Sequence, residues 1–248
     1  MTTGNEQQTL SRHVGVKTMI ATVENKKIIP AQLKEEFQIL LSGTFASEPE
    51  WLKEKRKETF DSFSNTGIPT RKNEEYKYTD IKKVFAGKFT SIHNELHTFS
   101  PDAAIPSALG KEQKVRLVFV NGWLYKDSTL SAQLPKGVIV GNLATDGLLK
   151  HSGLLKKYLR NDGDSLAQLN AALWTDGALI YVPENIQVET PIEIIHISTG
   201  TQEILASPRH LIVAENNSSV SVIESNISYE LNAQIIVNAH TDIFAEEN

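Results

Sequence analysis

The chain has 248 residues, of which 40% are hydrophobic and 22% charged, and it carries a net charge of −5. This composition is typical of a globular protein that can form a hydrophobic core. The absence of cysteine excludes disulfides, thiolate metal sites and cysteine nucleophiles from this sequence. No stretch approaches the roughly 20 apolar residues that a membrane-spanning helix needs.

The N-terminal part of the chain is predicted to be helical after a polar leader. Residues 1–18 lack the apolar segment of a secretory signal, so we expect a disordered leader and a cytoplasmic protein. Helical spacing of three and four residues then relates Leu33, Phe37, Leu40 and Leu41. A second helix is expected to begin near Ser47-Glu48-Pro49-Glu50, and residues 64–69 end it. We therefore predict a helical N-terminal region over residues 19–112.

The pattern changes to strands near residue 115. Residues 115–120 and 123–125 are rich in β-formers and flank Asn121-Gly122, a pair that predicts a tight hairpin. A short strand is expected at residues 138–140. Helical patterns follow at residues 143–160 and 165–173, and strand-like sequence begins at Gly177.

A repeat marks the C-terminal strands. Glu184, Glu215 and Glu246 are spaced 31 residues apart and each follows a short apolar run. A fixed period of this length indicates stacked units, and alternating apolar residues between the repeats predict strands with one buried face. We therefore predict a mainly β fold, a right-handed parallel β-helix (β-solenoid) core that starts at residue 113 and runs to 248. An antiparallel sandwich is the alternative.

The third copy of the repeat reaches the last residue, Asn248. An uncovered end of such a stack exposes backbone groups and core side chains. We therefore expect either an incomplete core, with further sequence beyond Asn248, or a second chain that covers this end.

Charge is distributed unevenly along the sequence. The segment from Asp176 to the end contains 11 acidic residues and one basic residue, Arg209, whereas the preceding segment is net positive. The acidic charge of this segment argues against binding of nucleic acid by that half of the chain. The basic residues at 71–83 alternate with acids, which indicates a solvated face; they are Arg71, Lys72, Lys77, Lys82 and Lys83.

Few residues suggest chemistry. His93 and His97 have a spacing that can bind zinc on a helix, but no third ligand is identifiable nearby. His196, His210 and His240 are interpreted as wall or surface residues. The Asp-Gly pairs at 146–147, 162–163 and 176–177 are interpreted as turns. Neither a phosphate-binding P-loop nor a G-x-S-x-G motif is present. We therefore predict no catalytic, cofactor-binding or metal-binding residues.

Several segments, taken in their order along the chain, resemble the SufB/SufD family of iron–sulphur cluster assembly proteins. The most specific is Gly67-Ile68-Pro69-Thr70-Arg71-Lys72-Asn73-Glu74-Glu75-Tyr76-Lys77-Tyr78-Thr79, preceded by Pro49-Glu50-Trp51-Leu52, Arg56 and Phe60. Weaker matches follow at residues 118–122, 169–173, 176–177, 191–192 and 207–212. Tyr76 stands where the family usually has tryptophan. The form of the Gly-Ile-Pro-Thr segment is more similar to the SufD branch than to SufB.

The resemblance implies a helical N-terminal region, a right-handed parallel β-helix and a non-catalytic scaffold role in the SUF complex. It implies SufB and the ABC-type ATPase SufC as partners, with no membrane or nucleic-acid partner. It also implies no cofactor within this chain, because the cysteine and histidine positions that the family ties to cluster assembly lie later than residue 248. A β-helix polysaccharide lyase or hydrolase is the alternative function, since paired carboxylates in a groove suit glycoside cleavage. A bare protein-interaction module is the third.

Overall fold

The computed structural model describes residues 29–91, 115–125 and 134–247. The predicted leader and the His93/His97 pair lie outside the described residues. The α-helices are α1 (Ala31–Ser42), α2 (Glu50–Thr66), α3 (Ile81–Val84), α4 (Leu148–Lys150), α5 (Ser152–Tyr158) and α6 (Ser165–Leu173). The short helices are η1 (Glu74–Tyr76), of 3-10 type, and η5 (Leu143–Gly147), of π type. The strands are β1 (Val115–Val120), β2 (Trp123–Leu124), β3 (Ile139–Asn142), β4 (Ala178–Val182), β5 (Ile192–Gly200), β6 (Ile204–Ala206), β7 (Arg209–Ala214), β8 (Val222–Leu231), β9 (Ile235–Val237) and β10 (His240–Ala245).

The two predicted N-terminal helices are confirmed as α1 and α2. Their apolar faces meet at Phe37 and Phe60, whose stacked rings have centroids 4.1 Å apart. The same core includes residues of α6 and of the strand region, among them Leu173 and Leu205. Helix α2 ends at Thr66, and the next residue, Gly67, has a φ of 76° that favours glycine.

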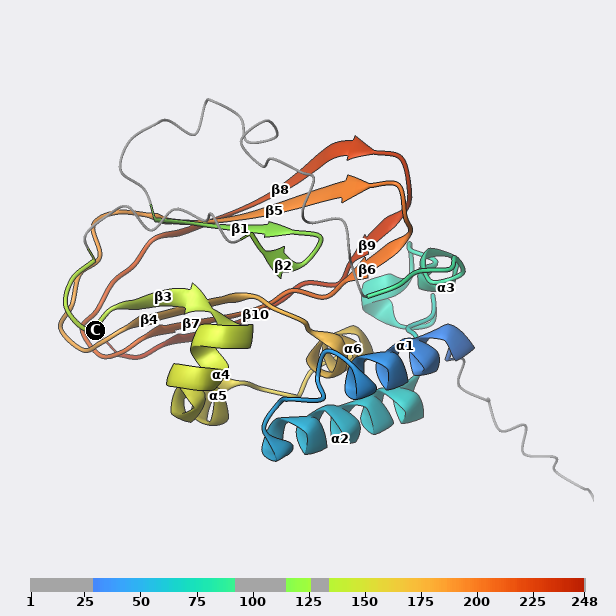
Figure 1. The fold of residues 1–248 in the computed structure, drawn as a ribbon, viewed down its shortest axis with the longest axis horizontal. Helices are drawn as coiled ribbons and strands as arrows, with labels where there is room; N and C mark the ends of the chain where they lie inside the picture. The colour runs from blue at the N-terminus through green and yellow to red at the C-terminus, as the bar shows by residue number, and fades with distance from the viewer. Residues whose placement is uncertain (1–28, 92–114, 126–133, 248) are drawn as a thin grey trace, which may run out of the picture.

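The strands form three sheets (Figure 1). Their orders are β2-β1-β5-β8, β10-β7-β4-β3 and β6-β9. The two four-stranded sheets face each other, and the pair β6-β9 lies at one end of them. Helices α4 and α5 cover the outer face of the β10-β7-β4-β3 sheet. Apolar side chains from both large sheets fill the space between them, including Leu117, Phe119, Ile180, Ile194 and Ile212.

The predicted right-handed parallel β-helix is wrong. Both four-stranded sheets are mixed, because β2 is antiparallel to β1 and β3 is antiparallel to β4. The described residues show no solenoid and no closed barrel, and six α-helices accompany the sheets. The apolar alternation fixes which face of a strand is buried, whereas strand direction depends on the connections. At β1 the connection is the predicted Asn121-Gly122 hairpin, which is confirmed, with both residues at positive φ.

The 31-residue spacing corresponds to parallel pairing within these mixed sheets. Strand β7 pairs with β4 and β10, and Val182 lies opposite Ala214. The backbone N–H of Glu215 donates to the carbonyl oxygen of Val182, and the backbone N–H of Glu246 donates to the carbonyl oxygen of Ala214. The repeated glutamates therefore lie just beyond adjacent strand ends. The division between residues 112 and 113 stays a prediction.

A buried ion pair joins β7 to β10. Arg209 donates through Nε and Nη2 to one carboxylate oxygen of Asp242, at 3.0 and 2.6 Å. Burial raises the pKa of Asp242, but the hydrogen bond from His240 and the charge of Arg209 together hold it below its usual value. Asp242 therefore stabilises the fold above the unfolded-chain pKa of about 3.9, and this contribution is lost as the pH falls through the lower, folded-state value.

The variant Asp242→Asn should consequently flatten the acid branch of the stability curve. Urea unfolding between pH 2 and pH 7 should show a steeper loss of unfolding free energy below about pH 4 for the parent than for the variant. The variant should also be less stable at pH 7, because Arg209 stays buried without its charge partner. Parallel curves for the two proteins would show that Asp242 does not contribute in this way.

Candidate functional site

Two histidines and one glutamate meet between the large sheets. His196 lies on β5, His210 on β7 and Glu224 on β8, so the group joins the two sheets. The histidines are 4% and 0% exposed, whereas the Glu224 side chain is 35% exposed. Phe119 contacts both imidazole rings, with centroids 5.5 and 5.6 Å away. The cluster is therefore apolar on the β1 side and open to solvent at the edge strand β8.

The polar atoms of the three side chains point at one another. Nε2 of His210 is 3.1 Å from Nε2 of His196, and Nε2 of His196 is 3.2 Å from Oε1 of Glu224. The third distance, from Nε2 of His210 to Oε1 of Glu224, is 3.9 Å. Three groups that can bind a proton or a cation thus converge on one point.

Hydrogen bonding restricts where protons can lie in this cluster. The backbone N–H of Ala178 donates to Nδ1 of His210 at 2.8 Å. A neutral His210 must then carry its proton on Nε2, which faces His196. Nε2 of His196 cannot accept that proton and at the same time donate to Glu224, so protons alone leave one of the two contacts unsatisfied.

The charges of the cluster follow from its burial. Burial, helped by the charge of His196, lowers the pKa of His210 to about 3, although Glu224 opposes this shift. The hydrogen bond with His196 lowers the pKa of Glu224 more strongly than burial raises it. At neutral pH the cluster therefore combines a neutral His210 with an ionised Glu224. Two imidazole nitrogens and a carboxylate are ligands that zinc and non-haem iron use in proteins, but Nε2 of the neutral His210 carries a proton because its Nδ1 accepts from Ala178, so this nitrogen has no free lone pair for a metal ion.

In the sequence, His196, His210 and His240 are interpreted as wall or surface residues, and no contact between any of them is predicted. His196 and His210 are indeed buried, whereas His240 lies apart and contacts Asp242 at 3.3 Å. No local spacing relates residues 196, 210 and 224, because they come from three strands in two facing sheets. Parallel pairing of β5 with β8, which places Ile194 opposite Glu224, is the signal that could have brought Glu224 to His196. That no residue of this chain is catalytic or ligand-binding stays a prediction.

Asp176 is another polar residue whose role the sequence missed. It was expected in a turn, yet it is buried and accepts hydrogen bonds from the backbone N–H groups of Leu124, Ala144 and Gly177 and from the Asn142 side chain. Burial raises the pKa of Asp176 more than these hydrogen bonds lower it. Asp176 therefore ties β2, β3 and η5 to the start of β4.

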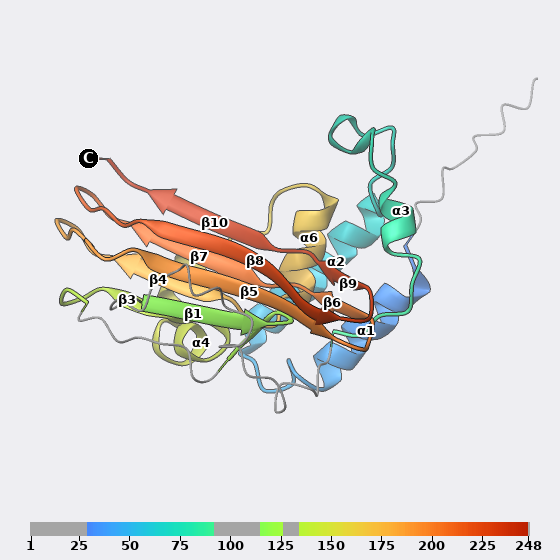
Figure 2. The same cartoon turned by 90° about the horizontal axis from the view of Figure 1, so that it is seen from above.

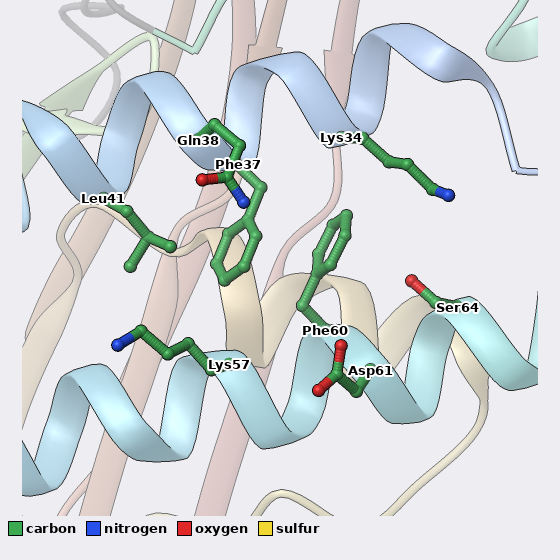
Figure 3. A pocket seen from close by; sticks show the side chains of 8 residues that line it. All are labelled: Lys34, Phe37, Gln38, Leu41, Lys57, Phe60, Asp61 and Ser64. Carbon is green, nitrogen blue, oxygen red and sulfur yellow. The ribbon is translucent and has the colours of Figure 1, made fainter.

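Two cavities in the helical part are weaker candidates. One, of 470 Å³, lies between α1 and α2, where Phe37 and Phe60 face each other and Lys34, Lys57 and Asp61 lie at the rim (Figure 3). The other, of 250 Å³, is lined by Trp51, Lys156 and Trp174 among others. Neither cavity is lined by histidine or by a pair of carboxylates. The basic residues at 71–83 are exposed, as predicted for a solvated face, and Lys77 pairs with Glu74.

No helix within the described ranges combines the length and hydrophobicity needed to cross a membrane.

Comparison with known proteins identifies the family. The family model of the SufBD protein N-terminal region matches residues 31–194. The iron-sulfur cluster assembly protein SufD of Bacillus subtilis is 30% identical over 214 residues, which cover 81% of this chain and 47% of that protein. An iron-sulfur cluster assembly SufBD family protein of Synechocystis sp. is 26% identical over 213 residues, 84% of this chain and 46% of the relative. The chloroplastic protein ABCI7 of Arabidopsis thaliana is 23% identical over 232 residues, 88% and 46% of the two chains.

The chain thus spans about half the length of these curated relatives. The matched region runs from α1 into β5 and includes the Gly-Ile-Pro-Thr segment on which the resemblance rested. The chain therefore belongs to the SufBD family, and residues 31–194 correspond to the N-terminal region of that family.

Proposed function

We propose that this chain is a non-catalytic scaffold subunit of the SUF iron–sulphur cluster assembly complex. Its partners would be SufB and the ATPase SufC, and it would act in the cytoplasm. The observation that carries the proposal is the family match over residues 31–194, together with relatives named as iron–sulphur cluster assembly proteins. The iron–sulphur cluster would be cargo of the complex, and we propose no resident cofactor for that scaffold role.

The arrangement of the strands supports an assembly role. Strands β8 and β10 are edge strands of the two large sheets, and with β9 they lie along the same side of the structure (Figure 2). Each of the three strands presents one exposed large apolar residue: Ile223, Val237 and Ile243. An edge strand offers backbone groups to which another strand can pair, and exposed apolar side chains favour contact with protein.

Co-purification tests this proposal. The chain should be co-expressed with tagged SufB and SufC from the same organism, and we expect it to elute with them in size-exclusion chromatography. Ile243→Lys, which puts a charge on the edge strand β10, should reduce recovery of the complex. The control is Leu149→Lys, an even more exposed apolar position on α4, which should leave recovery unchanged. Absence of the chain from both partners' fractions would contradict the scaffold role.

The alternative of a carbohydrate-active enzyme is not favoured. Glu184, Glu215 and Glu246 follow adjacent strands because of the repeat, and Glu215 accepts a hydrogen bond from the Tyr158 hydroxyl at 2.9 Å. The named relatives are cluster assembly proteins. Incubation with acidic polysaccharides should therefore give no cleavage products.

A further inference from the structure

We propose that the cavity between α2 and α5 is a binding site for an aromatic carboxylate. The cavity has a volume of 250 Å³, and the buried side chains of Leu52, Leu155 and Trp174 form part of its lining together with the partly exposed Trp51. This volume is below the roughly 300–1,000 Å³ of cavities that hold drug-sized ligands. The ligand must therefore be small, such as a single ring system that carries a short acid group.

The apolar lining favours a flat ring. Two of the three tryptophans of the chain, Trp51 and Trp174, line this one cavity. Indole rings are large and rigid, and they favour stacked or edge-on contacts with other aromatic rings. The larger cavity between α1 and α2 is less suitable, because Phe37 and Phe60 stack on each other and the acidic Asp61 lies at its rim (Figure 3).

The charged lining favours an anion. Lys55 and Lys156 border the cavity, and no acidic residue of the described chain lines it. Nζ of Lys156 lies 5.4 Å from the centroid of the Trp51 ring, which places its charge beside the aromatic wall. Within the described ranges neither lysine forms an ion pair, so both ammonium groups are available to a carboxylate of the ligand.

Asn161 adds a hydrogen-bond donor to the same cavity. Its Nδ2 atom is buried and has no acceptor among the residues that the structure describes. A buried donor without an acceptor is unfavourable, and a carboxylate oxygen of the ligand would satisfy it. The acid group of the ligand would thus contact Asn161 and the two lysines, with its ring against Trp51. This inference goes beyond the proposed scaffold role and requires no partner protein.

Titration of the isotope-labelled chain with phenylacetate, followed by NMR, tests the proposal. The indole N–H signals of Trp51, Trp123 and Trp174 can be assigned with single Trp→Phe variants. The signals of Trp51 and Trp174 should shift together and saturate with a dissociation constant on the order of 1 mM, as expected for a ligand of about ten non-hydrogen atoms. The signal of Trp123, which lies on β2 and does not line the cavity, should stay unchanged.

Matched ligands test each part of this chemistry. Phenylacetamide keeps the ring without the charge, and cyclohexylacetate keeps the charge without the flat ring, so each should bind at least about threefold more weakly. A short peptide with a C-terminal phenylalanine presents the same groups from a protein chain. Tighter binding of this peptide than of phenylacetate would identify a chain terminus as the source of the ligand, and equal or weaker binding would identify a free acid. Equal affinity for phenylacetamide or for cyclohexylacetate would contradict the proposal.

Variants of the charged lining locate the site. Lys55→Gln and Lys156→Gln each remove one exposed charge and should weaken phenylacetate binding at least about threefold. Asn161→Asp places a carboxylate in the cavity and should abolish the shifts. The matched control is Lys53→Gln, because Lys53 lies on the same helix, pairs with Glu50 and does not line the cavity; it should bind like the parent.

Thermal unfolding followed by circular dichroism checks that each variant folds. If Asn161→Asp does not fold, the two lysine variants decide, since both lysines are exposed. Tryptophan signals that do not shift in the parent, or unchanged affinity in both Lys55→Gln and Lys156→Gln, would overturn the proposal.

Discussion

The substitution Gly177→Ala is expected to prevent the chain from reaching its native fold. A Cβ atom at residue 177 would lie 1.4 Å from the carbonyl oxygen of Arg209 and 2.4 Å from its carbonyl carbon. Both are backbone atoms of β7, so no side chain can move aside to make room. The start of β4 would have to separate from β7. At this point the backbone N–H of Arg209 donates to the backbone carbonyl oxygen of Asp176 at 2.9 Å.

The expected loss exceeds the roughly 1–3 kcal/mol that ordinary overpacking costs, because whole strands and not rotamers must shift. Soluble yield and urea unfolding followed by circular dichroism measure it. Gly153→Ala is the matched control: it lies in α5, and nothing comes within 4 Å of the added Cβ. Alanine there should be neutral or add about 0.5–1 kcal/mol of stability. A Gly177→Ala protein that unfolds within 1 kcal/mol of the parent (about the cost of a mild core change) would refute the close approach of β4 and β7.

The local elements of the fold were predictable because neighbours in sequence determine them. The spacing of Leu33, Phe37 and Leu40 requires only a helical period, and Asn121-Gly122 requires only the turn that both residues favour. The 31-residue repeat correctly related strands that pair in parallel, such as β4 with β7. It said nothing of β2 and β3, which enter the sheets in the opposite direction and make them mixed.

The candidate site was less predictable because its geometry depends on contacts across sheets. His196 and His210 are only 14 residues apart, but β6 and a turn between them send their strands into different sheets. Asp176 resembled a turn residue because it precedes glycine, whereas its partners Leu124 and Asn142 are 52 and 34 residues away in sequence. Such groups become visible only when the register of several strands is known together.

The structural role of Arg56 was also not predictable, because the sequence shows this residue only as part of the family signature. Its side chain is fully buried, and its Nε and Nη2 atoms donate to the two carboxylate oxygens of Glu48, each at 2.8 Å. Nη1 donates to the carbonyl oxygen of Ala172 at 3.1 Å. The guanidinium carbon lies 3.6 Å from the ring centroid of Phe45 and 4.3 Å from that of Trp174. One side chain thus joins α2, the loop before it and α6.

The variant Arg56→Met should therefore destabilise the fold by about 3–5 kcal/mol, because it leaves the Glu48 carboxylate and the Ala172 carbonyl without their donor in a buried site. Chemical denaturation at pH 7 measures the loss. Lys53→Met is the control, since Lys53 makes an ion pair with Glu50 at the surface, and such pairs contribute about 0–1 kcal/mol. Adding Glu48→Leu to Arg56→Met removes the uncompensated charge and should recover much of the lost stability. If the double variant is no more stable than Arg56→Met, packing against Phe45 and Trp174, and not the buried charge, accounts for the contribution of Arg56.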